Sequence, residues 1–173
     1  MSTRMEVELH QKLLQKAGSL LSRRAYSRGE MRTKLSKLAD AEGVERILDR
    51  LEALSLLNDA DYAYNFAFNR IRQQGWGPIK VQQDLLQRQI ARQLIEAAID
   101  RVRGEFSDEV SLREYLNQHC RKTGLPGDRK RIQKLIGHLR RRGYVDATIY
   151  STLRQVIPET NWECFETGDR FGE

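Results

Sequence analysis

Hydrophobic residues recur along almost the whole chain at intervals of three and four, which is the period of an amphipathic helix. The first such stripe predicts a helix over roughly 5–23. Ser27 and Glu30 then have the spacing of a capping box, which starts another helix with Met31 in its apolar stripe. Further stripes of the same period follow as far as Pro158. The pattern therefore predicts a helical protein.

Short breaks rich in glycine, proline and capping residues separate the stripes. Residues 75–78 read Gly-Trp-Gly-Pro, in which glycine suits the left-handed end of one helix and proline suits the first turn of the next. The same glycine-then-proline break recurs at 124–128. Asn58 and Ser107 have the side chains and positions of N-caps. We expect Trp76 to fill a junction between two units.

The stripes repeat with a period of about 50 residues. Adding 54 to the residue number aligns Val81 with Leu135, Leu85 with Leu139, Ile90 with Tyr144, Ile95 with Ile149 and Ile99 with Leu153. Adding 50 aligns Met31 with Val81, after which the offset drops to 47 because the first unit has a longer turn at 39–43. Each unit is then a helix, a short turn, a second helix, a cap and a third helix. An ordinary irregular helix bundle with accidental register is the alternative.

The predicted fold is all-α: an elongated, curved stack of tandem three-helix repeats that follows an N-terminal helix. The divisions are 1–24 for the N-terminal helix, 25–74 and 75–123 for two three-helix repeats, 124–158 for a truncated third repeat, and 159–173 for an acidic tail. A unit of about 50 residues is too small to bury a core alone, so stacking between neighbours should supply much of the stability.

Composition and charge narrow the class of partner. Hydrophobic residues make up 39% of the 173-residue chain, which excludes a disordered protein. The net charge is +6, and it is segregated: residues 121–142 hold nine basic side chains against Asp128, whereas the stretch from Gln155 onward carries a net charge of −4. A local basic excess favours a polyanion or an acidic surface as partner, with a solvated helix face as the alternative.

Charge and expected exposure select the candidate residues for partner binding. They are Arg70, Arg72 and Lys80 around the first glycine–proline turn, and Arg121, Lys122, Arg129, Lys130, Lys134, Arg140, Arg141 and Arg142 in the basic stretch. No aromatic residue lies between Tyr115 and Tyr144, so base stacking is poorly supported within that stretch.

The sequence gives little support for a catalytic function. It contains no phosphate-binding loop, no nucleophile elbow and no zinc-protease motif, and its histidines are isolated in sequence. We expect no enzyme activity, no metal and no cofactor. Cys120 and Cys164 allow one disulfide, but reduced thiols are favoured in a cytoplasmic protein. A signal peptide and a membrane span are not expected.

An ordered set of caps, turns and stripes resembles the RecX family, regulators of the bacterial RecA recombinase. The central run reads Leu57-Asn58-Asp59-Ala60-Asp61-Tyr62-Ala63, Phe66, Arg70, Gly75-Trp76-Gly77-Pro78-Ile79-Lys80-Val81, Asp84-Leu85-Leu86 and Ile90. Upstream lie Leu20, Arg23, Ser27, Glu30-Met31 and Lys34-Leu35, and downstream Leu139 and Arg142-Gly143-Tyr144. The resemblance spans about 13–157 and departs from the family at the longer 39–43 turn, at Gln89, where glycine is common, and in the tail.

The resemblance implies an elongated all-α protein of tandem three-helix repeats. Polar outer faces of such a stack favour a monomer. Similar proteins lodge in the groove of the RecA filament and restrain filament extension, ATP hydrolysis and strand exchange in DNA repair and the SOS response. Some also bind DNA, so single- or double-stranded DNA is a second candidate partner. The alternative function is a free-standing helical DNA-binding protein that acts through its basic strip.

Overall fold

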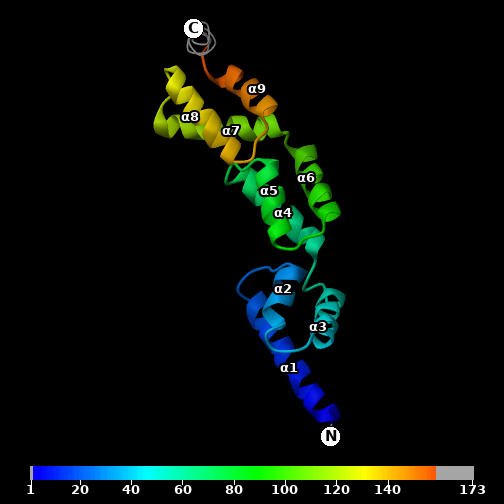
Figure 1. Cartoon of the computed structure of the whole chain (residues 1–173). Coiled ribbons are helices and arrows are strands. Elements are labelled where there is room, and N and C mark those ends of the chain that lie inside the picture. Colours follow the sequence, from blue (N-terminus) through cyan, green and yellow to red (C-terminus); the bar gives the residue numbers. More distant parts are fainter. Residues whose placement is uncertain (1, 159–173) are drawn as a thin grey trace, which may run out of the picture. The chain divides into compact units, whose positions relative to one another are not determined.

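The computed structural model describes residues 2–158, with side chains from Val7 onward. This part of the chain forms nine helices and no strand (Figure 1), which confirms the predicted all-α fold. The helices are α1 (Ser2–Leu21), α2 (Arg28–Leu35), α3 (Ala41–Ala53), α4 (Asp59–Arg72), α5 (Pro78–Gln87), α6 (Arg92–Glu105), α7 (Asp108–Thr123), α8 (Arg129–Arg141) and α9 (Asp146–Val156).

The described chain packs into two compact units. Unit 1 holds the described residues up to Asn65 together with Asp84–Ala98, and unit 2 holds Phe66–Gln83 together with the described residues from Ile99 on. Helices α4, α5 and α6 each contribute residues to both units. The repeat boundaries are a division of the sequence, and they stay a prediction.

The core of unit 1 lies among α1, α2 and α3. Its buried members are Leu13, Ala17, Tyr26, Met31, Leu35, Val44, Ile47, Leu48, Leu51 and Leu57. The capping box at the start of α2 is confirmed: the Ser27 hydroxyl accepts a hydrogen bond from the Glu30 backbone N–H at 3.0 Å. In return the Glu30 carboxylate accepts one from the Ser27 N–H at 3.2 Å.

Arg28 ties α2 to α3 on the outside of this core. Its guanidinium lies 2.7 Å from carboxylate oxygens of Glu45 and Asp49 and 2.5 Å from that of Glu52. Hydrogen bonds from Arg32 and Arg28 lower the pKa of Glu45 to about 2. The acidic face of α3 is thereby largely neutralised within unit 1.

The core of unit 2 lies among α7, α8 and α9. Its buried members are Leu112, Leu116, Ile132, Leu135, Ile136, Leu139, Tyr144, Ile149, Leu153 and Ile157. Ile132, Leu135, Ile136 and Leu139 of this set recur at intervals of three and four and form the apolar face of α8. Asp128 caps the helix by accepting a hydrogen bond from the Arg131 N–H at 2.8 Å. The basic side chains of α8 therefore lie on its remaining faces.

Two contacts between helix ends, which we call joints, have the same arrangement in the two units and support the predicted repeat. In unit 1 the Ser27 hydroxyl donates to the carbonyl of Arg88 at 2.6 Å, and in unit 2 the Gly77 N–H donates to the carbonyl of Arg142 at 2.7 Å. Ser27 and Gly77 stand 50 residues apart, and Arg88 and Arg142 stand 54 apart, which are the offsets read from the hydrophobic stripes. In both units, therefore, the start of one helix is hydrogen-bonded to the end of a helix that lies one predicted repeat later in the sequence.

The turn after each of these helices also repeats. Gln89 has φ +60 and Gly143 has φ +88, and each precedes a buried residue, Ile90 or Tyr144. Gln89 therefore keeps the left-handed backbone that a glycine adopts with less strain. At Gly143 glycine is required, because a Cβ there would lie 2.4 Å from the backbone nitrogen of Lys80.

The structure also departs from the stripes read in the sequence. Leu38 and Leu54 continue the three-residue spacing after Leu35 and Leu51. They are nevertheless about half exposed, at 50% and 49%, because α2 ends at Leu35 and α3 ends at Ala53. On α4 the inward positions belong to small side chains, since Ala63 and Ala67 are fully buried. The Tyr62 and Phe66 rings, four residues apart on the same helix, are only half-buried.

Candidate functional site

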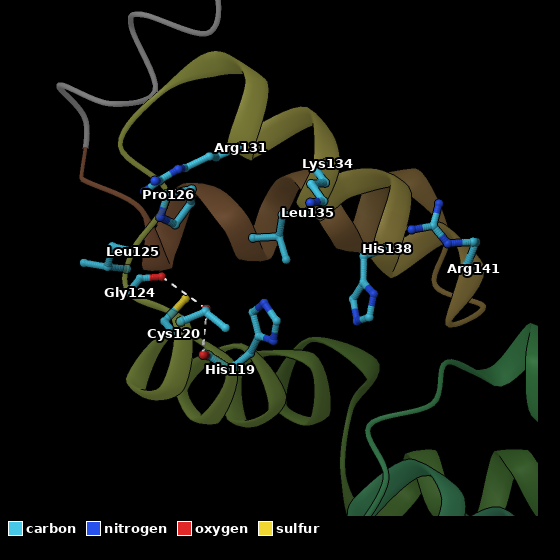
Figure 2. A pocket seen from close by; sticks show the side chains of 11 residues that line it. His119, Cys120, Gly124, Leu125, Pro126, Arg131, Lys134, Leu135, His138 and Arg141 are labelled. Carbon is cyan, nitrogen blue, oxygen red and sulfur yellow. Dashed lines mark hydrogen bonds between the residues drawn. The ribbon is translucent and has the colours of Figure 1, made fainter.

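A cleft of about 360 Å³ opens between α7 and α8 in unit 2 (Figure 2). Its lining residues are His119, Cys120 and Thr123 of α7, Gly124, Leu125 and Pro126 of the connecting loop, and Arg131, Lys134, Leu135, His138 and Arg141 of α8. The polar members from α8 follow one another at intervals of three and four, so they project from one face of that helix. We call this the α7–α8 cleft.

The α7–α8 cleft combines positive charge with an apolar surface. None of its lining residues is a carboxylate. Arg131 has a carboxylate oxygen of Asp128 at 3.6 Å, an exposed contact within one helical turn that is worth little energy. Leu125, Pro126 and Leu135 supply the apolar part. Such a lining suits an anionic ligand that also carries an apolar group.

Three rings are stacked beside the cleft. The centroids of His119 and His138 lie 5.7 Å apart, and that of Tyr115 lies 5.9 Å from His119. The Arg142 Nε donates to His138 Nε2 at 3.0 Å. Because a guanidinium can only donate, Nε2 must accept, which places the ring proton on Nδ1 and leaves the imidazole neutral. Burial, and next the charge of Arg142, lower the pKa of His138.

The depressed pKa of His138 makes the stability of unit 2 sensitive to acid. Below the ordinary histidine pKa of about 6.5 the unfolded chain binds a proton that the folded chain does not, so stability falls as the pH drops. We expect the Tm of the unmodified protein to fall more between pH 7.5 and pH 5.5 than that of His138→Gln, which keeps an acceptor but cannot titrate. Thermal unfolding followed by circular dichroism measures both, and equal falls would contradict the assignment.

Arg142 joins the end of α8 to the turn before α5. Its guanidinium donates to the carbonyls of Gln74 and Gly75, the latter at 3.0 Å. It also lies over the Tyr115 ring, 4.2 Å from the centroid. Gly75 has φ +60, and a Cβ there would lie 2.2 Å from that ring, so the turn admits only glycine. Arg142 thus serves the structure of unit 2.

The Trp76 ring, in the same turn, contacts two of the basic residues predicted to bind the partner. The Arg70 guanidinium lies 4.6 Å and the Lys80 ammonium 4.0 Å from the centroid of its ring. Trp76 is half-buried, and the two cations cover it within unit 2. Cation–π contacts of this kind hold a positive side chain in place while its charge still faces outward.

The turn before α5 lies against the end of α8, because the Ile79 N–H donates to the Gly143 carbonyl at 3.2 Å. The charges of Lys80 and Arg141 consequently both act on the ring of His138. The structure thus brings together cations far apart in sequence. We call Arg70, Lys80, Arg131, Lys134 and Arg141 the basic surface of unit 2.

The other predicted residues lie elsewhere. Arg72 pairs with Glu114 at 2.5 Å and covers the Phe106 ring, while Arg140 pairs with Asp146 at 2.8 Å. The remainder do not line the cleft: Arg121, Lys122 and Lys130 are exposed, and Arg129 is half-buried. Sequence reasoning left out Arg131, whose spacing from Lys134, His138 and Arg141 would have placed it on their face. Partner contact by any of these residues stays a prediction.

Other features bear on the class of protein. Within residues 2–158 no helix is long and apolar enough to cross a lipid bilayer. Over the same range no three histidine, cysteine or acidic side chains are grouped to hold a metal ion. Cys120 forms no disulfide with a described residue. Cys164 and the acidic tail at 159–173 lie outside the described residues.

The fold and the cleft define an all-helical repeat protein with a positively charged surface. A family model described as RecX, second three-helix domain, matches residues 58–99. The regulatory protein RecX of Prosthecochloris aestuarii is 34% identical over 149 residues, which cover 84% of this chain and 94% of that protein. The chain belongs to the RecX family of regulatory proteins, as the order of its caps and turns predicted.

Further relatives agree with this assignment. The regulatory protein RecX of Chlorobium phaeobacteroides is 30% identical over 80% of this chain and 89% of its own length. A crystal structure of RecX from Lactobacillus salivarius superposes with a TM-score of 0.74 over 86% of this chain and 97% of that one. Its sequence identity of 19% shows the shared fold alone.

Proposed function

We propose that the protein binds the filament that bacterial RecA recombinase forms on DNA, and that it restrains filament extension, ATP hydrolysis and strand exchange. Membership of a family of regulatory proteins supports a role that needs no chemistry of its own. The observation that carries the proposal is the basic surface of unit 2: Arg131, Lys134 and Arg141 line a cleft without a lining carboxylate, and the charge of Lys80 acts on His138 in the same lining.

Binding alone accounts for such restraint. A ligand shifts a conformational equilibrium only as far as its affinities for the two states differ. A protein that binds one conformation of neighbouring filament subunits more tightly than the next conformation in the ATPase cycle slows that cycle. DNA phosphates and acidic side chains both offer negative charge to the basic surface. Arg70 and Lys80 suit this task because the Trp76 ring holds them in place.

The decisive experiment measures the DNA-dependent ATPase rate of RecA while this protein is added at less than one copy per RecA subunit. We expect the rate to fall in proportion to the added protein. An unchanged rate at every ratio would remove the RecA filament as partner. The free-standing DNA-binding alternative predicts that unchanged rate, together with an affinity for naked DNA that falls steeply and linearly on a log–log plot against salt concentration.

A further inference from the structure

We propose that the C-terminal segment of this chain, residues 159–173, docks in the α7–α8 cleft and there competes with the partner. The regulatory meaning of this contact rests on the proposed function, because it assumes that the partner uses the same cations. The docking itself is a property of the isolated protein, and it is tested without any partner.

The chemistry of the segment complements that of the cleft. Its sequence contains five acidic residues, Glu159, Glu163, Glu166, Asp169 and Glu173, against one basic residue, Arg170. It also contains three aromatic residues, Trp162, Phe165 and Phe171. The cleft offers the matching groups: Arg131, Lys134 and Arg141 for carboxylates, and the apolar surface of Leu125, Pro126 and Leu135 for rings. The segment is therefore an anionic ligand that carries apolar groups.

The point of attachment brings the segment within reach. Ile157 is 3% exposed and belongs to the same core cluster as Leu135, which lines the cleft. The end of α9 and the loop between α7 and α8 lie at the same end of unit 2 in both views (Figures 1 and 2). Fifteen residues follow Pro158. At ~3.3 Å per residue they can span roughly 50 Å, more than twice the ~20 Å length of α8.

Tethering favours this occupant over a free one. A segment joined to its site by a short chain reaches an effective concentration of about a millimolar, so weak contacts suffice to fill the cleft. A polyanionic partner must then displace the segment to reach Lys134 and Arg141. The contact works as an autoinhibitory device, and added salt, which screens exposed charges, weakens it.

Cys120 lines the cleft and provides a reporter for its occupancy. We propose to measure the alkylation rate of Cys120 by iodoacetamide in the full chain carrying Cys164→Ser, which leaves this single thiol. Two variants of that chain are compared with it: Trp162→Ala/Phe165→Ala, which keeps the charge of the segment, and Glu163→Gln/Glu166→Gln, which keeps its rings. Burial raises the pKa of Cys120. Rates are therefore compared at a single pH of about 8, where the lysine and arginine side chains of the cleft keep their charge.

We expect both variants to raise the alkylation rate roughly threefold or more, because each removes one half of the contact that fills the cleft. A reporter introduced as Ser19→Cys in the exposed face of α1, with Cys120→Ser, serves as the control and should react equally in all three chains. If the Cys120 rate is the same in all three chains, the docking is overturned. The RecA ATPase measurement is separate, so either idea can fail while the other stands.

Discussion

Replacing Arg142 by alanine is expected to lower the free energy of unfolding by about 2–3 kcal/mol, because hydrogen bonds from a charged group contribute about that much when part-buried. The guanidinium donates to two backbone carbonyls of the 74–75 turn and to the ring of His138. Alanine removes the guanidinium donor from both carbonyls, leaves His138 Nε2 with only the Tyr115 hydroxyl at 2.8 Å, and uncovers the Tyr115 ring. The end of α8 and the turn before α5 then lose the Arg142 side chain, which connects them.

Its neighbour provides the matched control. Arg141 is exposed and lines the cleft, so Arg141→Ala is expected to change the free energy of unfolding by less than ~0.5 kcal/mol. Arg142→Lys keeps the charge but cannot reach two carbonyls with a planar fork, and it should be nearly as destabilising as Arg142→Ala. Urea unfolding followed by circular dichroism measures all three. Equal midpoints for the Arg141 and Arg142 variants would show that the junction contacts contribute nothing.

The pair also shows where sequence reasoning ends. Both arginines belong to one basic run, and nothing in that run separates them. Their roles differ because Arg142 is the C-cap of α8, where the chain turns, while Arg141 stays on the helical face that lines the cleft. A difference of one residue at the end of α8 decides which arginine side chain reaches the 74–75 turn. That difference depends on tertiary packing.

The positions of helix caps and helix starts, in contrast, could be predicted closely from the sequence. The caps at Ser27, Asn58 and Ser107 and the proline start at Pro78 lie where the sequence indicated, because each depends on contacts within four residues. The stripes were less reliable at helix ends, as the exposure of Leu38 shows. The joining of Lys80 to the end of α8 could not be predicted, since a backbone hydrogen bond between Ile79 and Gly143 creates it.

Comparison of the two joints explains why the positive charge accumulates in unit 2. In unit 1 the Arg88 guanidinium donates at 2.9 Å both to the Glu30 carboxylate and to the Tyr62 hydroxyl. An offset of 50 residues places Lys80 where the first joint has Glu30. Arg142, the counterpart of Arg88, is satisfied by backbone carbonyls and neutral rings, which bring no negative charge.

The joint in unit 2 therefore carries a surplus of positive charge that the joint in unit 1 does not. A carboxylate replaced by an ammonium changes the local charge by two units, and Trp76 keeps that ammonium beside the cleft. The two joints therefore share the same geometry but differ in charge. This difference between equivalent positions supports the basic surface of unit 2 as the place where a polyanionic partner binds.

Reversing two charges of that surface is expected to have the largest functional effect. Lys134→Glu combined with Arg141→Glu should weaken inhibition of the RecA ATPase by about tenfold or more, because like charges then face the partner where opposite charges did. Neither residue forms an ion pair with another described residue, and neither belongs to the core. Thermal unfolding should therefore change little, which separates lost binding from lost structure.

The control must remove the same charge elsewhere. Lys34→Glu with Lys37→Glu changes the net charge equally on exposed positions of unit 1. Inhibition should stay within about twofold of that of the unmodified protein, since neither lysine lines the cleft. The concentration that halves the RecA ATPase rate is compared for the three proteins at two salt concentrations. If both pairs weaken inhibition alike, net charge governs the interaction and the cleft has no special part. If only the Lys134 and Arg141 pair does so, the α7–α8 cleft is the contact.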